Sequence, residues 1–232
     1  PINQIATLAK ENGSLVLLDA CQSLAHMKVD IKELNIDFLA GSGHKLCGPT
    51  GIGFLWAKEE ILNVVPPFFG GGEMIEEVFE EKSTWAELPH KFEAGTPAIA
   101  EAIGLAEALK YINKIGLENI NAYEKNLTAY LFERLNKIKN LHIIGPQPNI
   151  DSNRAALAAF YVEGIHSNDI AEILDSKGVC IRSGHHCCQP LHRYLGLKST
   201  ARVSMNFTTS TKDIDSFIER LDDTIDFLKF NS

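Results

Sequence analysis

Lys45 lies in the segment AGSGHKLCGPTGIG, residues 40–53, among glycines and small polar residues. A glycine-rich segment with one lysine first suggests that it binds a nucleotide phosphate. The P-loop ends in Gly-Lys-Ser/Thr, whereas here His44 precedes the lysine and Leu46 follows it. The dinucleotide fingerprint G-x-G-x-x-G fails as well, since Leu46 stands where its third glycine is required. The remaining chemistry is nucleophilic, because a lysine amine can form an imine with a carbonyl compound.

A second reactive segment is SGHHCCQPLH, residues 183–192, which holds three histidines and the adjacent pair Cys187 and Cys188. Both residue types are zinc ligands. Adjacent ligands rarely reach one tetrahedral ion together, and the sequence has no second, spaced ligand pair. We therefore expect no metal site here.

Asp19 ends the apolar run SLVLLD, residues 14–19, which predicts a buried parallel strand. FLAGSG at 38–43 predicts another strand, directly before Lys45. Ligands of open α/β sheets bind outside the carboxyl ends of such strands. An acid to pair with a pyridinium nitrogen and a lysine to form an imine are the minimum that pyridoxal phosphate requires. Taken alone, Asp19 could instead cap a helix and Lys45 could be a solvated loop lysine.

The rest of the first half supplies further elements for these residues. GIGFLWA at 51–57 predicts a third strand, on the far side of the lysine segment. Residues 66–78 hold two prolines and three glycines, which predicts a surface excursion. Apolar residues at helical spacing then predict helices at 101–116 and 118–138.

After Leu141 the pattern changes to short apolar runs alternating with helices. Strands are predicted at 141–145, 155–164, 179–184 and 201–207. Two helices are predicted: 167–178, capped by Ser167 or Asn168 and stopped by Gly178, and 210–230, with capping-box spacing of Ser210 and Asp213. We predict an α/β protein with part of a large parallel-sheet domain at 1–115 and a smaller α/β domain at 116–232.

Composition narrows the function. A net charge of −8 argues against a nucleic-acid surface, which needs a basic face. No apolar run approaches the ~20 residues of a membrane span, and no signal peptide is recognised. Five cysteines, an odd count without a C-x-x-C pair, favour a reducing compartment over a disulfide framework. Cys21, Cys47 and Cys180 are expected to be buried as small hydrophobic residues.

Four motifs in order carry a resemblance to a known family. They are DACQSLAHMKVDIKELNIDFLAGSGHKLCGPTGIGFLW (19–56), FEAGTP (92–97), IRSGHHCCQP (181–190) and ARVS (201–204). Together they resemble SufS-like (group II) cysteine desulfurases and selenocysteine lyases, which are pyridoxal-phosphate enzymes of the aspartate-aminotransferase fold (fold type I). The segment HHCCQPLHRYLG is similar to cyanobacterial or plastid members, which implies a cytoplasmic or plastid protein. Such enzymes are roughly twice as long, so we expect this chain, which begins with Pro1, to be the carboxy-terminal portion.

For the cofactor, the resemblance implies that Lys45 holds pyridoxal phosphate covalently and later moves protons. Asp19 would keep the ring nitrogen protonated, and Gln22 would bind the ring oxygen. Ser42 and His44 would bind the phosphate. Thr96 would reach the phosphate in a partner subunit, which implies a homodimer with shared sites; otherwise it belongs to a simple turn.

For the sulfur chemistry, the resemblance implies that Cys187 is the nucleophile that becomes a persulfide. Neighbouring imidazoles and Arg182 would favour its thiolate. Arg202 would clamp the substrate carboxylate with its planar fork, assisted by Arg182. Cys188 stands where the family has a small residue, and it would be a bystander or a partner in a vicinal disulfide. On an extended loop, alternate residues face opposite ways, which would turn Cys188 away from the cofactor.

The function so implied converts L-cysteine to L-alanine and passes sulfur to an acceptor protein of the SufE or SufU type for iron–sulfur cluster assembly. Two alternatives stay open. The chain could act on L-selenocysteine as a lyase, or it could be a catalytically silent half-chain that only dimerises or docks a sulfur acceptor.

Overall fold

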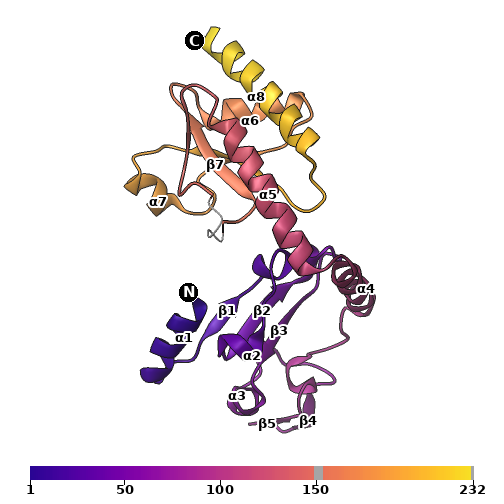
Figure 1. Cartoon of the computed structure of the whole chain (residues 1–232). Helices are drawn as coiled ribbons and strands as arrows, with labels where there is room; N and C mark the ends of the chain where they lie inside the picture. The colour runs from indigo at the N-terminus through magenta and orange to yellow at the C-terminus, as the bar shows by residue number, and fades with distance from the viewer. Residues whose placement is uncertain (149–153, 231–232) are drawn as a thin grey trace. The chain divides into compact units, whose positions relative to one another are not determined.

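The structure is a computed structural model and describes residues 1–148 and 154–230. The chain folds into two compact units, Pro1–Asn119 and Ile120–Ser232 (Figure 1). That the first is part of a cofactor-binding domain and the second a small domain carrying the catalytic cysteine remains a proposal. None of the helices in the described residues is both long and apolar enough to span a bilayer.

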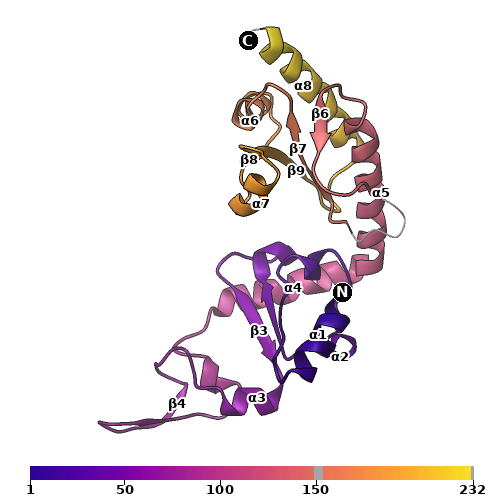
Figure 2. The ribbon, with the colours of Figure 1, turned by 90° about the vertical axis from the view of Figure 1, so that its left-hand side faces the viewer.

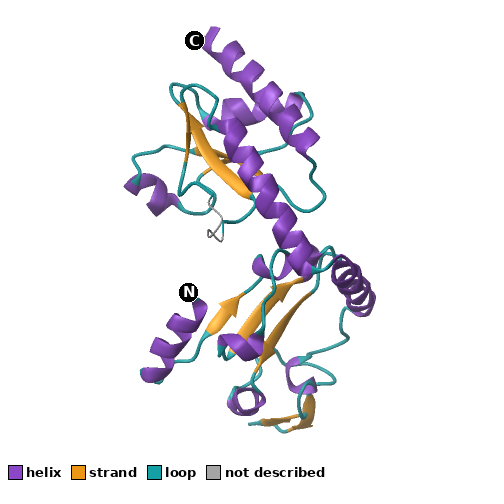
Figure 3. Cartoon of the chain, in the orientation of Figure 1, coloured by secondary structure: helices purple, strands orange, loops and turns teal. Residues whose placement is uncertain are grey.

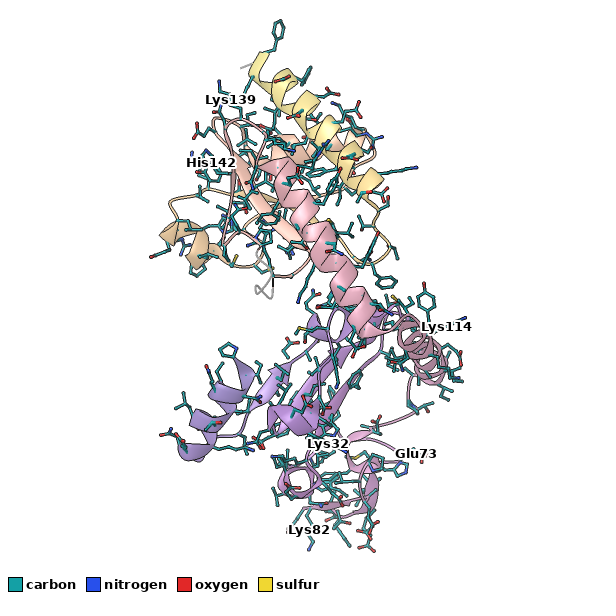
Figure 4. The ribbon with its side chains drawn as sticks, in the orientation of Figure 1. Lys32, Glu73, Lys82, Lys114, Lys139 and His142 are labelled. Carbon is teal, nitrogen blue, oxygen red and sulfur yellow. The ribbon has the colours of Figure 1, made fainter. Side chains whose placement is uncertain are left out.

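The first unit is built around a three-stranded sheet. Its elements in chain order are α1 (Ile2–Glu11), β1 (Leu17–Asp19), η1 (Ser23–Ala25), α2 (Ile31–Leu34), β2 (Phe38–Ser42), η2 (Gly43–Leu46), β3 (Gly53–Ala57), α3 (Glu59–Val64), β4 (Ile75–Val78), β5 (Ser83–Trp85), η3 (His90–Phe92) and α4 (Ile99–Ile115). The predicted strands and the helix at 101–116 are confirmed within a few residues. The predicted excursion at 66–78 runs into the hairpin of β4 and β5, whose turn carries Lys82 (Figure 4).

The sheet has the order β1-β2-β3, with β1 parallel and β3 antiparallel to β2. Strands β2 and β3 approach one another closely, which explains why small residues occur in both. A Cβ atom on Gly41 would lie 2.4 Å from the Phe54 ring, and one on Gly53 would lie 2.7 Å from the Gly41 carbonyl oxygen. These glycines therefore let the two strands meet directly before the segment that carries Lys45.

The prediction that 14–19 is a buried strand is wrong for this chain. β1 is parallel to β2 as predicted, yet Leu17 is 59% exposed and Leu15 is 60% exposed. The physical reason is that β1 pairs on one side only within the described residues, so its apolar side chains are not covered.

A buried ion pair ties the start of β2 to the rest of the first unit. Asp37 is 3% exposed; it accepts a hydrogen bond of 2.8 Å from the backbone N–H of Val16 and one of 2.7 Å from Lys58 Nζ. Burial opposes ionisation of Asp37, but these hydrogen bonds outweigh it and hold the pKa of the carboxyl below its ordinary value. The ionised carboxylate therefore contributes stability above its ordinary pKa, and that contribution is lost as the pH falls through the lowered pKa.

We expect Asp37→Asn to lower the free energy of unfolding of the first unit by about 1–3 kcal/mol at pH 7. The effect should shrink in acid, where the wild-type carboxyl also becomes protonated. Urea unfolding followed by tryptophan fluorescence reports on this unit, since Trp56 and Trp85 are the two tryptophans of the chain. Glu107→Gln, which breaks the exposed pair with Lys110, is the control and should cost less than about 1 kcal/mol. An equal loss in both variants would contradict the role of burial.

The second unit is a helix layer on an antiparallel sheet (Figures 2 and 3). Its elements are α5 (Leu117–Leu135, which begins in the first unit), β6 (Leu141–Ile143), β7 (Leu157–Val162), α6 (Ser167–Ser176), β8 (Arg182–Gly184), α7 (Gln189–Tyr194), β9 (Thr200–Ser204) and α8 (Thr211–Phe230). The strand order is β6-β7-β9-β8, with every pair antiparallel. The predicted strands and helices of this half are confirmed, although each strand is shorter than predicted.

Alternation along β7 decides which face of this sheet is covered. Ala158, Phe160 and Val162 are buried, while the residues between them are half-buried. The buried set forms one cluster with side chains of α5, α6, α8 and β9, such as Phe132 and Leu221. Helices therefore cover one face, which leaves the loops at the strand ends free to carry polar groups. On β6, His142 (Figure 4) stacks on Tyr161 of β7 with ring centroids 4.8 Å apart.

Helix capping follows the sequence in one case and departs from it in the other. At α8, Ser210 N–H donates to Asp213 Oδ2 at 2.7 Å and Asp213 N–H donates to Ser210 Oγ at 3.3 Å, which confirms the capping box. At α6, the predicted cap by Ser167 or Asn168 is wrong. His166 is the N-cap, and its Nδ1 accepts from the backbone N–H of Asn168 at 3.2 Å. Gly178, with φ +78°, follows the helix end as predicted.

Candidate active site

Lys45 lies at the carboxyl end of β2, in one turn of 3-10 helix instead of an open loop. Two backbone hydrogen bonds fix this turn: Gly43 N–H donates to Ile52 O at 2.9 Å and Gly48 N–H donates to Gly43 O at 3.0 Å. A Cβ atom on Gly43 would lie 2.7 Å from the Ile52 side chain, so a glycine is needed there. The turn is thereby held rigidly against the start of β3.

Asp19 ends β1 beside β2, paired in register with Ala40. Its Oδ1 accepts a hydrogen bond of 3.0 Å from the backbone N–H of Cys21. Hydrogen bonds from the Cys21 thiol and N–H, together with the charge of Lys45, hold the pKa of the Asp19 carboxyl below its ordinary value. The same interaction raises the pKa of the Cys21 thiol. Asp19 is thus an exposed carboxylate kept ionised within electrostatic reach of Lys45.

The structure brings most of the predicted cofactor residues together at this edge. Gln22 is exposed and directly precedes η1, and η1 contacts the 3-10 turn that holds Lys45. Ser42 Oγ lies 3.1 Å from His44 Nδ1, so the two predicted phosphate ligands are already neighbours. Thr96 is exposed in the bend before α4, where Gly95 N–H donates to Gly72 O at 2.9 Å.

These residues fit pyridoxal phosphate on chemical grounds. Within residues 1–148 and 154–230, no hydrogen bond or ion pair engages Lys45 Nζ, so its amine is available for a bond to an aldehyde. Its neighbour Asp19 is ionised, as a partner of a protonated ring nitrogen must be. The hydroxyl of Ser42 and the imidazole of His44 supply polar groups for a phosphate on the same turn.

The second group of predicted residues lies in the other unit, around a tight turn. Cys188 N–H donates to His185 O at 2.9 Å, and the two residues between them, His186 and Cys187, have φ of 51° and 63°. Positive φ at both central positions is the geometry of a type I′ turn, which non-glycine residues rarely adopt. Such strain is found where a structure must hold one side chain in a fixed place.

This turn corrects the expectation of an extended loop. The thiols of Cys187 and Cys188 point in different directions because of this turn, and not because residues alternate along a strand. Cys187 is exposed, and Arg182 Nη2 donates to its Sγ at 3.3 Å. Cys188 is half-buried, and its thiol donates to His185 O at 3.0 Å. The turn therefore presents Cys187 outward beside a guanidinium and directs Cys188 back to the backbone.

Two arginines face one another beside this turn. Arg182 on β8 is paired in register with Arg202 on β9, so both side chains leave the same face of the sheet. Like charges directly opposite one another are unfavourable unless an anion lies between them. Arg202 Nε is buried and has no hydrogen-bond partner. An open hollow of about 500 Å³ lies here, lined by Arg182, Ser183, His185, His186, Cys187, Gln189 and Pro190. This arrangement suits a small substrate with a carboxylate.

The sequence missed part of this neighbourhood. Helix α7 was not predicted, and sequence patterns assigned no role to His192, which lies on that helix. His192 is 5% exposed, and its Nε2 lies 3.1 Å from Thr200 Oγ1. The four-residue spacing of Cys188 and His192 was the available signal. Within residues 1–148 and 154–230, no three His, Cys, Asp or Glu side chains lie close enough to hold a metal ion.

The expectation for the remaining cysteines is wrong. Cys47 and Cys180 are exposed, and Cys21 is half-buried. Cys47 has φ 59° at the end of the 3-10 turn, and the Cys180 thiol donates to Asp175 at 3.3 Å. Their positions follow from the turns that they occupy, which composition does not reveal.

Comparison with known proteins agrees with this geometry. The model of the family described as aminotransferase class-V matches residues 1–217. The chain belongs to the class-V aminotransferase family. It is 53% identical over 227 residues to a probable cysteine desulfurase of Synechocystis, covering 98% of this chain and 54% of that protein.

The chain also resembles solved structures of cysteine desulfurases. The cysteine desulfurase CsdA of Escherichia coli gives a TM-score of 0.90 at 33% identity, over 97% of this chain and 55% of that one. The cysteine desulfurase of Thermococcus onnurineus, in its apo form, gives 0.89 at 38% identity, over 96% of this chain and 55% of that one. The predicted α/β fold and the resemblance to cysteine desulfurases are thus confirmed. The chain spans about half the length of these relatives.

Proposed function

We propose that this class-V aminotransferase chain supplies the lysine, carboxylate and thiol of a SufS-like cysteine desulfurase, which converts L-cysteine to L-alanine and keeps the sulfur on Cys187. The observation that carries this proposal is the hydrogen bond of 3.3 Å from Arg182 to Cys187 Sγ. A solvent-exposed thiol on a strained turn beside two arginines is what sulfur abstraction requires in addition to the cofactor residues.

In the first unit, each residue has one task. Bound pyridoxal phosphate supplies an electron sink for the bonds at the substrate α-carbon. Lys45 would hold the cofactor and move protons to and from the substrate. Asp19 would keep a proton on the ring nitrogen, because its carboxyl is kept ionised by Cys21 and Lys45. Gln22 would bind the ring oxygen. Ser42 and His44, with Thr96 of a second copy, would bind the phosphate.

In the second unit, the residues bind the substrate and remove its sulfur. Arg202 and Arg182 bind the substrate carboxylate bidentately and orient it. The thiolate of Cys187 attacks the substrate sulfur, so a sulfur–sulfur bond forms as the carbon–sulfur bond breaks. The electron pair of the broken bond stays with the carbon, which takes a proton delivered by Lys45 and becomes the methyl group of alanine. Arg182 stabilises the negative charge on Cys187 before attack.

The persulfide on Cys187 would then pass its sulfur to an acceptor protein of the SufE or SufU type for iron–sulfur cluster assembly. The exposure of Cys187 supports this step, because an acceptor thiol must reach the outer sulfur. We propose a homodimer in which Thr96 of one copy serves the cofactor site of the other, because Thr96 is exposed and accessible to a partner, and a cytoplasmic or plastid location.

The test of this function uses the protein that contains this chain, with pyridoxal phosphate and L-cysteine. We expect alanine to form in step with persulfide on Cys187. Asp19→Asn should keep the fold and lose turnover by about 10²-fold or more, because a neutral amide no longer holds the ring proton. Alanine is quantified by chromatography. Failure of the unchanged protein to form alanine would reject the proposal, and normal turnover of Asp19→Asn would show that Asp19 only caps the segment after β1.

A further inference from the structure

Thr200, the first residue of β9, is 1% exposed and joins two histidines of the cysteine segment. Its Oγ1 lies 3.0 Å from His186 Nε2 and 3.1 Å from His192 Nε2. Its carbonyl oxygen lies 3.1 Å from His186 Nε2 as well. One buried hydroxyl therefore connects the strained turn, helix α7 and the sheet.

The protons of this cluster can be assigned, because a hydroxyl has one hydrogen to donate. His192 Nδ1 lies 3.2 Å from Cys188 O, which can only accept, so Nδ1 carries a hydrogen. With one hydrogen on the His192 ring, its Nε2 is an acceptor at 3.1 Å, and the Thr200 hydroxyl donates to it. The hydroxyl oxygen must in turn accept from His186 Nε2, and the Thr200 carbonyl accepts from the same N–H.

This assignment leaves His186 Nδ1 without a hydrogen. That atom is buried and has no hydrogen-bond partner. Burial, and the charges of Arg202 and Arg182, lower the pKa of His186, which agrees with a neutral ring. With one hydrogen on each imidazole, the polar atoms that face Thr200 are satisfied in one arrangement of tautomers.

The turn needs such an anchor. His186 and Cys187 both have positive φ, a conformation that persists only where surrounding contacts impose it. The His186 ring bonds the turn to Thr200 of the sheet, and His186 is next to Cys187 in the chain. If the ring of His186 is released, the turn can relax, and the contact of 3.3 Å between Arg182 and Cys187 Sγ is lost.

We propose that Thr200 is a positioning residue: its hydroxyl fixes the tautomers of His186 and His192 and thereby holds the Cys187 thiol beside Arg182. The importance of that position rests on the proposed function, but the arrangement itself does not depend on a cofactor or a substrate. It can therefore be tested by thiol chemistry alone.

The experiment compares Thr200→Val, which keeps the shape and removes the hydroxyl, with Thr200→Ser, which keeps the hydroxyl. Each protein is treated with iodoacetamide at pH 7, and alkylation of Cys187 and of Cys188 is followed separately by peptide mass. We expect Thr200→Val to slow alkylation of Cys187 by about threefold to tenfold, because the cationic donor no longer lies beside the sulfur. Thr200→Ser should stay within about twofold of the wild type, since the hydroxyl that donates and accepts is retained.

Two outcomes would overturn the proposal: an unchanged rate in Thr200→Val, or an equal loss in both variants, which would mean that only packing matters. A second measurement covers the case in which Thr200→Val does not fold. Nitrogen-15 NMR of the imidazole rings in the unchanged protein should show hydrogen on Nε2 of His186 and on Nδ1 of His192. The opposite tautomers would contradict the assignment. These readouts need no alanine formation, so their failure is distinguishable from failure of the proposed desulfurase activity.

Discussion

Lys45→Ala is expected to abolish the visible absorbance of pyridoxal phosphate bound to the protein, together with alanine formation. The amine of Lys45 lies on a rigid turn at the carboxyl end of β2, and its charge acts on the Asp19 carboxyl. An alanine at this position cannot bond to the aldehyde, and no other lysine side chain is placed on this turn. The cofactor would then be held by the phosphate and ring contacts alone.

The measurement has two parts. Absorbance spectra of the purified variant are compared with those of Lys28→Ala, which removes an exposed lysine between β1 and β2 and should keep the band. Borohydride treatment of the unchanged protein, followed by peptide mapping, should place the cofactor on Lys45. A label on Lys28 or Lys58 would show that the site has been assigned to the wrong lysine.

How far the sequence could predict the fold is seen in the two halves of the chain. The apolar run of β7 and the helical spacing of α8 are local patterns, so both elements were predicted to within two residues of their ends. The exposure of β1 could not be predicted, because SLVLLD has the composition of a buried strand and covering it depends on other chain segments. The cap of α6 was misjudged for a similar reason: His166 has no strong preference for that position, and its ring also contacts Ser199.

In the candidate site, too, features set by local sequence could be predicted and features set by packing could not. Lys45 and Asp19 could be proposed from the sequence because their types and the strands before them are visible there, whereas the roles of Arg182 and Arg202 came from the family resemblance alone. The Arg182–Arg202 pair and the Thr200 cluster could not be predicted, since both depend on the register between β8, β9 and α7. The turn at His186 and Cys187 was the hardest feature. Positive φ is normally indicated by glycine or asparagine, and neither occurs there.

Cys187→Ala is expected to remove persulfide formation and to reduce alanine formation to background while leaving cofactor binding intact. Cys188 carries the same thiol one residue away, so the two cysteines differ in position and not in chemistry. Arg182 reaches Cys187 Sγ, whereas the Cys188 thiol donates to His185 O and lies 3.8 Å from His192 Nδ1. Cys188 could take over only if the turn that contains both cysteines opened. Its thiol would have to leave the His185 carbonyl and move to the exposed side.

Cys188→Ala is the matched control, since it deletes an identical atom on the inner side of the same turn. We expect it to keep most of the activity, within about threefold of the wild type, because a half-buried thiol that only donates a hydrogen bond to a neutral carbonyl contributes little to stability or to catalysis. Each variant is incubated with L-cysteine, alanine is measured, and the persulfide is located by peptide mass. Exposure and the arginine contact together make Cys187 the sulfur that a substrate meets first. A persulfide that forms on Cys188 at a comparable rate in Cys187→Ala would mean that the turn opens during the reaction, and the assignment of the nucleophile would then be wrong.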